Sequence, residues 1–313
     1  MNKLPIVAVV GPTASGKTEL AVALAKKLGG EIISADSMQI YKGMHIASAA
    51  PDEEEKQGVP HHLIEFLPPD KTFSVADYVC LAKEFCREIA SRQKTVILAG
   101  GTGLYINSLL DNITFDDARP DMALREKLNR EYAEKGGEAM LEELRRFDPE
   151  SANRLHPNNN KRIIRAFEIY LTSGITMTQQ LENSKKEPSP YIPYMIGLTY
   201  FDRNILYDRI NLRIDKMLMS GLLDEAKKAY DSQNKGTGSQ AIGHKEFFPF
   251  FEGNATLEEC TETLKGETRR YAKRQLTWFR KDERIDWIYK DLTEDPLDEA
   301  LKTLERKGYF DTK

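Results

Sequence analysis

The chain has 313 residues, of which 40% are hydrophobic and 30% charged, and its formal net charge is −4. This length favours about two domains with enough apolar residues for a core, and because no apolar run approaches the roughly 20 residues that cross a bilayer, we expect no membrane-spanning segment. The acidic net charge does not by itself point to a nucleic-acid partner. The cysteines lack CxxC spacing and indicate a reduced, cytoplasmic protein.

The first predicted element is a buried strand, Ile6–Val10, which follows the N-terminus so directly that we expect no signal peptide. A loop of the pattern GxxxxGK[ST] and a helix with a leucine stripe come next. Strand, glycine loop and helix form the setting of a P-loop, in which backbone N–H groups and the helix N-terminus bind phosphate. Lys17 adds a positive charge there, and the hydroxyl of Thr18 can ligate Mg²⁺, the cofactor that we expect. The predicted phosphate-binding residues are Gly11, Pro12, Thr13, Ala14, Ser15, Gly16, Lys17 and Thr18.

A second buried strand is predicted at Glu31–Ala35, and it ends at Asp36. Ligands of an open α/β sheet bind outside the carboxyl ends of its strands, so we expect Asp36 to lie beside the phosphate site. A turn or cap role explains an aspartate at this position equally well.

Residues 42–70 are predicted to form a loop with short elements. We interpret the acidic run Asp52–Glu55 as a solvated face. The adjacent histidines, His61 and His62, cannot both face one metal from a regular element, and no further cluster completes a zinc set. We therefore interpret the two histidines as structural, with at most one of them facing a ligand.

A helix predicted from the capping box Ser74–Asp77 to about Ala90 leads into a third buried strand, Thr95–Ala99. In a P-loop ATPase or GTPase such a strand usually ends in an aspartate, whereas this one ends in the turn Gly100–Gly103. The glycines indicate a close backbone approach, and Thr102 offers a hydroxyl group. A tight strand-to-helix turn explains the glycines equally well but leaves the missing acid unexplained.

Between residues 115 and 193 strand-like runs disappear, and helical segments broken by prolines and glycines take their place. One of these helices begins with Lys161, Arg162 and Arg165, whose positive charge opposes the helix macrodipole. We infer that an outside anion compensates this charge. Pairing of the arginines with Glu168 is the alternative.

The sheet is predicted to resume at Tyr194–Thr199, and a long helix follows. Arg203, Arg209 and Arg213 on this helix are balanced by neighbouring aspartates, so we assign no function to their charge. The glycine-rich loop 236–246 carries basic and amide groups and is a candidate binding loop, although flexible surface loops are commoner.

A second capping box, Thr256–Glu259, begins a helix that we expect to run to about Lys281. Its second half concentrates positive charge without acidic residues and interleaves Tyr, Trp and Phe, which is typical of a contact with a nucleic-acid backbone. A solvated basic helix whose aromatic residues pack in the core is the alternative. The cations are Arg269, Arg270, Lys273, Arg274 and Arg280.

Residues 285–289 alternate in polarity and predict a last strand. The order of the elements predicts an α/β protein, with a P-loop NTPase-like parallel sheet flanked by helices and an all-helical insertion domain. We assign residues 1–114 and 194–313 to the P-loop core domain and residues 115–193 to the insertion.

Six motifs follow one another along nearly the whole chain: Gly11–Thr18, Asp36–Tyr41, Gly100–Tyr105, Lys161–Ala166, Gly243–Glu246 and Tyr271–Arg280. Together they resemble the tRNA dimethylallyltransferases, also called isopentenyl-tRNA transferases. Each motif alone is common, but the ordered set is highly specific. Two loops depart from the family pattern. The family often has Asp-Ile-Gly-Thr-Ala-Lys-Pro where this chain has His45–Pro51, and often a tyrosine where His244 stands.

The resemblance implies transfer of the dimethylallyl group from dimethylallyl diphosphate to the exocyclic N6 amine of the adenosine 3′-adjacent to the anticodon, after that base flips out of its stack. The P-loop would hold the diphosphate leaving group, whose charge Lys17 and a Mg²⁺ ion on Thr18 would stabilise. Asp36 would act as the general base, and Thr102 would orient Asp36 or the amine. The residues implied to contact tRNA are Asp36, Ser37, Met38, Gln39, Thr102, Lys161, Arg162, Ile163, Ile164, Arg165, Gln240, Gly243, His244, Lys245, Arg270, Lys273 and Arg274.

The implied partners are the tRNA anticodon stem-loop and dimethylallyl diphosphate, without a membrane, for a protein that we expect to be a monomer. Two rivals stay open: a small-molecule kinase that uses ATP on the P-loop, and a P-loop RNA-binding protein without catalytic activity. Such a kinase would need neither the basic helix nor the cationic cluster at residues 161–165.

Overall fold

The computed structural model describes residues 3–115, 121–184, 186–232 and 241–312. The chain forms two compact units, Met1–Leu110 with Ser189–Lys313, and Asp111–Pro188. The sequence analysis placed these boundaries at residues 114 and 193. Each unit has a hydrophobic core of its own.

The first unit is built on a sheet of six parallel strands in the order β3-β2-β4-β1-β5-β6. The strands are β1 (Leu4–Val10), β2 (Gly30–Ser34), β3 (His61–His62), β4 (Thr95–Gly100), β5 (Tyr191–Thr199) and β6 (Ile285–Tyr289). This parallel sheet, flanked by helices, confirms the predicted fold class. The edge strand β3 was not predicted, because two residues are too short to show an alternating pattern.

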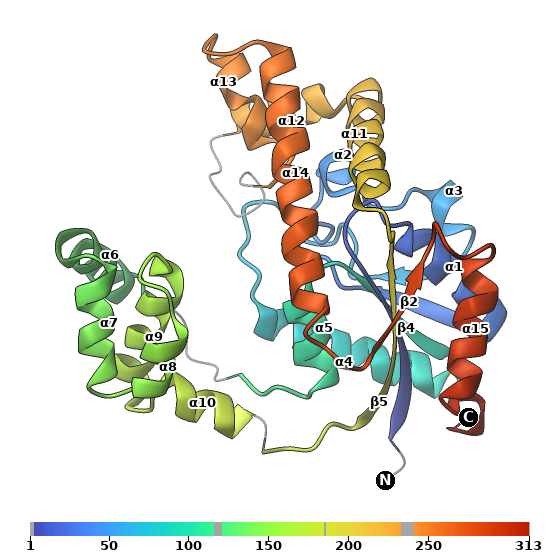
Figure 1. Ribbon diagram of the computed structural model, residues 1–313, viewed down its shortest axis with the longest axis horizontal. Coiled ribbons are helices and arrows are strands. Elements are labelled where there is room, and N and C mark those ends of the chain that lie inside the picture. Colours follow the sequence, from blue (N-terminus) through green and yellow to red (C-terminus); the bar gives the residue numbers. More distant parts are fainter. Residues whose placement is uncertain (1–2, 116–120, 185, 233–240, 313) are drawn as a thin grey trace. The chain divides into compact units, whose positions relative to one another are not determined.

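Helices cover both faces of the sheet (Figure 1). α1 (Lys17–Leu28) and α15 (Pro296–Arg306) pack on one face, and α4 (Val75–Ser91) and α5 (Gly103–Leu110) pack on the other. Alternate residues of β1 point toward α1 and join its leucines in one core, because side chains along a strand alternate between the two faces. The buried strands therefore hold the loops at their carboxyl ends in fixed positions.

A second core lies among α11 (Arg203–Met219), α12 (Leu222–Asp231) and α14 (Leu257–Phe279). Both predicted capping boxes are confirmed: Ser74 caps α4 and Thr256 caps α14. The short elements of this unit are α2 (His45–Ser48), α3 (Glu53–Lys56), η2 (Lys245–Phe247), α13 (Phe248–Phe251) and η3 (Tyr309–Thr312). None of the helices in the described ranges is long and apolar enough to span a bilayer.

The second unit consists of helices in the residues that the structure describes. They are α6 (Met122–Lys135), α7 (Gly137–Arg145), α8 (Pro149–Arg154), α9 (Asn160–Ser173) and α10 (Met177–Ser184). The buried carboxylate of Glu168 accepts hydrogen bonds from Arg125 at 2.8 Å and Arg165 at 3.4 Å. Because a buried charge is costly without partners, the bond from Arg125 holds α6 against α9, whereas that from Arg165 lies within α9.

Candidate active site

The loop between β1 and α1 requires glycine at two positions. Gly11 stands where an added Cβ would lie 2.3 Å from the carbonyl oxygen of Leu198, and Gly16 caps α1 with a φ of 89°. Only glycine meets both demands without strain. The ammonium group of Lys17 donates a hydrogen bond back to the Pro12 carbonyl at 3.3 Å, so it lies over the loop rather than out in solvent.

The environment of Lys17 favours contact with an anion. Burial lowers its pKa from 10.5 to about 8, the negative charge of Asp36 raises it, and the positive charge of Arg213 lowers it. A desolvated ammonium group beside another cation regains much of its lost solvation energy when a phosphate binds. The electrostatics at this loop therefore favour the binding of an anion.

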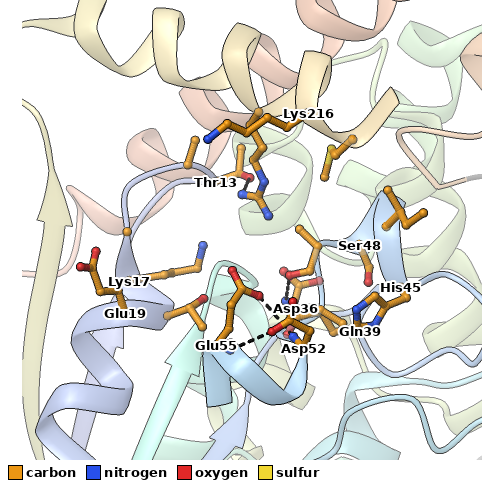
Figure 2. A pocket seen from close by; sticks show the side chains of 18 of the residues that line it. Thr13, Lys17, Glu19, Asp36, Gln39, His45, Ser48, Asp52, Glu55 and Lys216 are labelled. Atoms are coloured by element: carbon orange, nitrogen blue, oxygen red, sulfur yellow. Dashed lines mark hydrogen bonds between the residues drawn. The ribbon is translucent and has the colours of Figure 1, made fainter. Parts of the chain in front are cut away.

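A cavity of about 730 Å³ opens in front of this loop (Figure 2). Lys17 enters it from α1 and Lys216 from α11, while Asp36 and Glu55 lie on its wall. Two of the three arginines of α11, Arg209 and Arg213, also line it. Nη1 of Arg213 donates to the Thr13 hydroxyl at 3.0 Å, and Nε of Arg209 donates to the Ala14 carbonyl at 3.3 Å.

The sequence analysis assigned no function to these arginines and was wrong to treat their charge as balanced. Asp202 instead caps α11, and Asp215 pairs with Lys265 at 2.9 Å. The recurrence of Arg209, Arg213 and Lys216 at helical spacing was the signal that could have identified them.

The acidic run Asp52–Glu55 is exposed, as expected, but the fold gives two of its residues a further position. Asp52 and Glu55 form a capping box on α3, and both also line the large cavity. With Thr18 and Asp36 they place hard oxygen atoms around it. Among the described residues no group of three or more metal-ligating side chains forms a closed site.

Asp36 occupies the turn that follows β2. Its Oδ1 accepts a hydrogen bond from the Met38 N–H at 2.9 Å, the local turn that was one of the two open interpretations. The Thr102 hydroxyl accepts one from the Ser37 N–H at 3.0 Å, so Thr102 fixes the turn that carries Asp36. A Cβ added at Gly100 would lie 2.2 Å from the Ala35 carbonyl oxygen, so that glycine permits close packing of two strand ends.

Helix α14 contributes a polar clamp that the sequence analysis missed. The side-chain oxygen of Gln275 accepts from the Thr13 N–H at 2.9 Å, and its amide nitrogen donates to the Gly101 carbonyl at 3.0 Å. One turn away, burial and the charge of Asp36 raise the pKa of Tyr271. The face of α14 that carries Gln275 and Tyr271 thus holds the loops of the site together. In the sequence, a glutamine among basic residues did not indicate this role.

A second, more apolar cavity of about 300 Å³ also reaches Asp36. It shares Thr13, Asp36, Ser48, Arg213 and Met217 with the first cavity. Its remaining wall comes from apolar side chains of α11 and the 241–243 loop, and from α14 through Tyr271 and Arg274. Asp36 therefore lies on the walls of a large polar cavity and a more apolar one. The large cavity is lined by four basic and four acidic side chains, and we call it the cationic cavity after the basic ones, Lys17, Arg209, Arg213 and Lys216.

The basic cluster on α14 is partly neutralised. Arg270 is 70% exposed and pairs with Glu267, one turn back. Glu267 lies just before the acid-free stretch, so the sequence analysis did not consider it as a partner. Arg269 donates to Asn211 at 2.6 Å. Lys273 and Arg274 are exposed, and the Arg274 guanidinium lies over the Tyr271 ring.

His244 does not present its side chain to solvent, which corrects its assignment as a contact residue. It is 1% exposed, and its Nε2 donates to Glu225 at 2.8 Å. Although burial raises the pKa of Glu225, hydrogen bonds from His244 and from the Ala47 and Ile46 amides lower it. Gly243 is buried as well, whereas Lys245 is exposed, and Gln240 lies outside the described residues.

In α9, two of the five predicted contact residues are part of the core. Ile163 is fully buried and Ile164 is 5% exposed, because the apolar face of the helix packs inside the second unit. Lys161, Arg162 and Arg165 are exposed. Of the two alternatives for these cations, pairing with Glu168 holds for Arg165, at 3.4 Å.

Known proteins match this chain over nearly its full length. Residues 39–282 match the family described as IPP transferase. The tRNA dimethylallyltransferase of Bacillus subtilis is 49% identical over 305 residues, which cover 97% of this chain and 96% of the relative, and that of Halalkalibacterium halodurans is 47% identical over 300 residues, which cover 96% and 95%.

Solved structures agree. The full-length tRNA isopentenylpyrophosphate transferase of Bacillus halodurans superposes with a TM-score of 0.72 at 43% identity, covering 99% of this chain and all of that one. A eukaryotic dimethylallyltransferase acting on tRNA gives a TM-score of 0.81 at 26% identity, covering 99% of this chain and 80% of that one.

Proposed function

The chain belongs to the IPP transferase family and transfers a prenyl group to tRNA; we propose that the donor is dimethylallyl diphosphate and that the acceptor is the exocyclic N6 amine of the adenosine 3′-adjacent to the anticodon. A bond forms between the amine nitrogen and the allylic carbon while the carbon–oxygen bond to diphosphate breaks. The products are N6-prenylated tRNA, diphosphate and a proton. The enzyme must therefore hold a leaving anion and remove a proton.

We place the diphosphate in the cationic cavity. Lys17, Arg209 and Arg213 line it, together with the P-loop residues Thr13, Ala14, Gly16 and Thr18. Negative charge develops on the diphosphate as it leaves, so these groups bind the transition state more tightly than the ground state. No attacking water is required, which agrees with a strand β4 that ends in glycine rather than in an acid.

The oxygen atoms around this cavity also suit Mg²⁺. We propose that the Thr18 hydroxyl ligates the ion, with Asp36, Asp52 and Glu55 within the same cavity. Mg²⁺ is commonly held by one or two protein oxygens together with substrate phosphates, so a closed protein cage is not needed. When bound, the ion neutralises charge on the diphosphate.

The observation that carries the proposal is the place of Asp36 on the walls of both the cationic and the apolar cavity. Donor and acceptor can then approach from different sides and meet at one carboxylate. We propose that Asp36 accepts a hydrogen bond from the amine and takes its proton, while Thr102 positions the turn.

For tRNA contacts we propose the exposed polar groups at the site and the exposed cations of both units, acting in the cytoplasm with the protein as a monomer. The cations are Lys161, Arg162, Arg165, Lys245, Arg270, Lys273 and Arg274. We propose that the helical unit binds RNA through α9. Cations at phosphates supply affinity without sequence selectivity, whereas contacts to the flipped base supply selectivity.

Labelled substrates test the reaction directly. Wild-type protein is incubated with an anticodon stem-loop and either prenyl-labelled dimethylallyl diphosphate or γ-labelled ATP. We expect label in RNA only from the isoprenoid. Phosphate transfer from ATP to a metabolite, or RNA binding without transfer, would support one of the rivals, neither of which the comparisons favour.

A further inference from the structure

The walls of the cationic and the apolar cavity have five residues in common, and four of them are polar or charged. These four are Thr13, Asp36, Ser48 and Arg213. The fifth is Met217 of α11, so among the described residues one apolar side chain lies on both walls. A hydrocarbon chain that reacts where the two cavities meet has this side chain as its apolar partner.

The spacing of side chains along α11 explains why Met217 occupies the boundary. With about 3.6 residues per turn, residues four apart lie along one strip of a helix. One strip of α11, which includes Lys216, lines the cationic cavity alone, and another, with Ile210 and Ile214, lines the apolar cavity alone. Arg213 and Met217 are four residues apart and form the strip between these two, so both of them line both cavities.

The strip of Arg213 and Met217 matches the polarity of a prenyl diphosphate. Nη1 of Arg213 donates to the Thr13 hydroxyl at 3.0 Å, which holds the guanidinium group at the loop between β1 and α1. Four residues further on, a rise of about 6 Å along the helix axis, the same strip becomes apolar at Met217. A donor that lies along α11 with its diphosphate at Arg213 therefore places its hydrocarbon chain against Met217.

Met217 also has the surroundings that a contact with a short hydrocarbon chain requires. It is partly buried and packs against a buried cluster that includes Ile210, Ile214 and Leu222. Its unbranched, polarizable side chain adapts to the shape of a branched ligand. Leu212, another apolar residue of α11, lines the cationic cavity alone and is 55% exposed, so a chain placed there would stay partly in water.

We propose that Met217 contacts the prenyl chain of the donor and limits that chain to five carbons. The inference rests on the proposed function and names a residue that selects the donor. The allylic carbon has to lie near Asp36, and the branched end of a five-carbon chain then meets Met217. The acceptor base enters from the apolar cavity beyond, so a second five-carbon unit finds room only if Met217 is shortened.

Met217→Ala tests the contact, with Met219→Ala as the matched control. Met219 lies on the same helix, is 89% exposed and belongs to neither cavity wall. Each protein receives an anticodon stem-loop with either dimethylallyl diphosphate or geranyl diphosphate, whose chain carries a second five-carbon unit, and the two kcat/KM values are compared. A single methylene in an apolar pocket changes discrimination by about 10–200-fold. We therefore expect Met217→Ala to lower the preference for dimethylallyl diphosphate at least ~10-fold, and Met219→Ala to keep the wild-type preference and rate.

Leu212→Ala distinguishes the two positions available to the chain, because it removes an apolar group from the cationic cavity alone. We expect this variant to keep the wild-type preference between the two diphosphates. An unchanged preference in Met217→Ala, or an equal loss of preference in Leu212→Ala, would overturn the inference and leave the proposed function intact. Wild-type protein that transfers neither chain would reject the proposed function, and the inference with it.

If Met217→Ala does not fold or transfers neither chain, NMR of wild-type protein with ¹³C-methyl-labelled methionine decides. The probe is an unreactive analogue of dimethylallyl diphosphate with sulfur in place of the bridging oxygen. We expect nuclear Overhauser effects between its prenyl methyl protons and the Met217 methyl group, whose signal is identified by its loss in Met217→Leu. The Met219 methyl group should show none. A bound analogue without this contact at Met217 would overturn the inference.

Discussion

Arg213 is the residue whose substitution tests donor binding. Its guanidinium lies 3.0 Å from the Thr13 hydroxyl on the wall of the cationic cavity. A hydrogen bond to a charged group contributes about 1.5–3 kcal/mol, so we predict that Arg213→Ala raises KM for dimethylallyl diphosphate at least ~10-fold. Steady-state kinetics measure this KM. Arg203→Ala, at the exposed start of the same helix, is the control, and equal effects of the two variants would contradict the assignment.

Lys17 gives donor binding a pH dependence. Its pKa of about 8 means that the free enzyme loses this charge as pH rises past 8, whereas bound diphosphate favours the protonated form. We predict that dimethylallyl diphosphate binds ~10-fold more weakly at pH 9 than at pH 7 and that a proton is taken up on binding at pH 9. Calorimetry in two buffers of different ionisation enthalpy measures both. The Lys17→Arg variant stays charged over this pH range, so its affinity for dimethylallyl diphosphate should lose this pH dependence. If the pH dependence persisted in the variant, titration of the ligand rather than of Lys17 would explain it.

For single residues, the sequence predicted well the positions that local sequence determines. The glycines of the loop after β1, and Asp36 at the end of a strand beside that loop, are of this kind. It missed Arg213 and Gln275 because their partners, Thr13 and Gly101, are distant in sequence and adjacent only after folding. It also could not tell that the polar residue His244 would be buried, since burial depends on Glu225 from another helix.

Helix α14 performs two tasks on its different faces. Gln275 holds the P-loop from one face, while Arg270 and Arg274 project from the exposed side. We predict that Arg270→Ala combined with Arg274→Ala lowers the salt dependence of tRNA binding, because each lost phosphate contact reduces the slope of log K against log salt by about 0.7–0.9. Filter binding at several salt concentrations measures the slope.

The control for α14 removes the same charge elsewhere. Lys302→Ala with Arg306→Ala on α15 changes net charge equally, at residues paired with Asp298 and Glu299. This variant should keep the wild-type slope. If both double variants gave the same slope, α14 would not contact phosphate specifically.

Elements with a long periodic pattern and a cap were predictable, and α4 and α14 begin at their predicted capping boxes. The strand β3 was not, because it exists only through pairing with β2, and its two residues carry no signal of their own. The acidic run at α3 is exposed as predicted, but the pattern marks its residues only as polar, and the fold is what places two of them at a cavity.

For the whole molecule, the division into two units allows a test of whether the helical unit binds RNA. The hydroxyl of Ser189 donates to the Leu110 carbonyl at 2.6 Å, so the chain leaves and re-enters the first unit at one point. We predict that replacing residues 111–188 with a short Gly-Ser linker keeps the affinity for dimethylallyl diphosphate within about threefold and weakens tRNA binding at least ~10-fold. Calorimetry and filter binding measure these affinities. Undiminished tRNA binding would contradict a role for the helical unit in RNA recognition.

The order of the predicted elements indicated both the sheet and the helical segment of the chain. The period of the hydrophobic residues distinguishes strands from helices, and prolines and glycines mark where the helices break. The meeting of two cavities at one carboxylate was not predictable, because it joins side chains of α1, α11, α14 and the β2 turn. This meeting is the central claim for function.

Asp36→Asn tests that claim most directly, since it keeps the shape of the side chain and removes its basicity. In single-turnover transfer from dimethylallyl diphosphate to an anticodon stem-loop, we predict a rate lower by about 10²–10⁴-fold, with the Kd for each substrate within about threefold of wild type. Transfer at the wild-type rate would contradict the assignment of Asp36 as the general base.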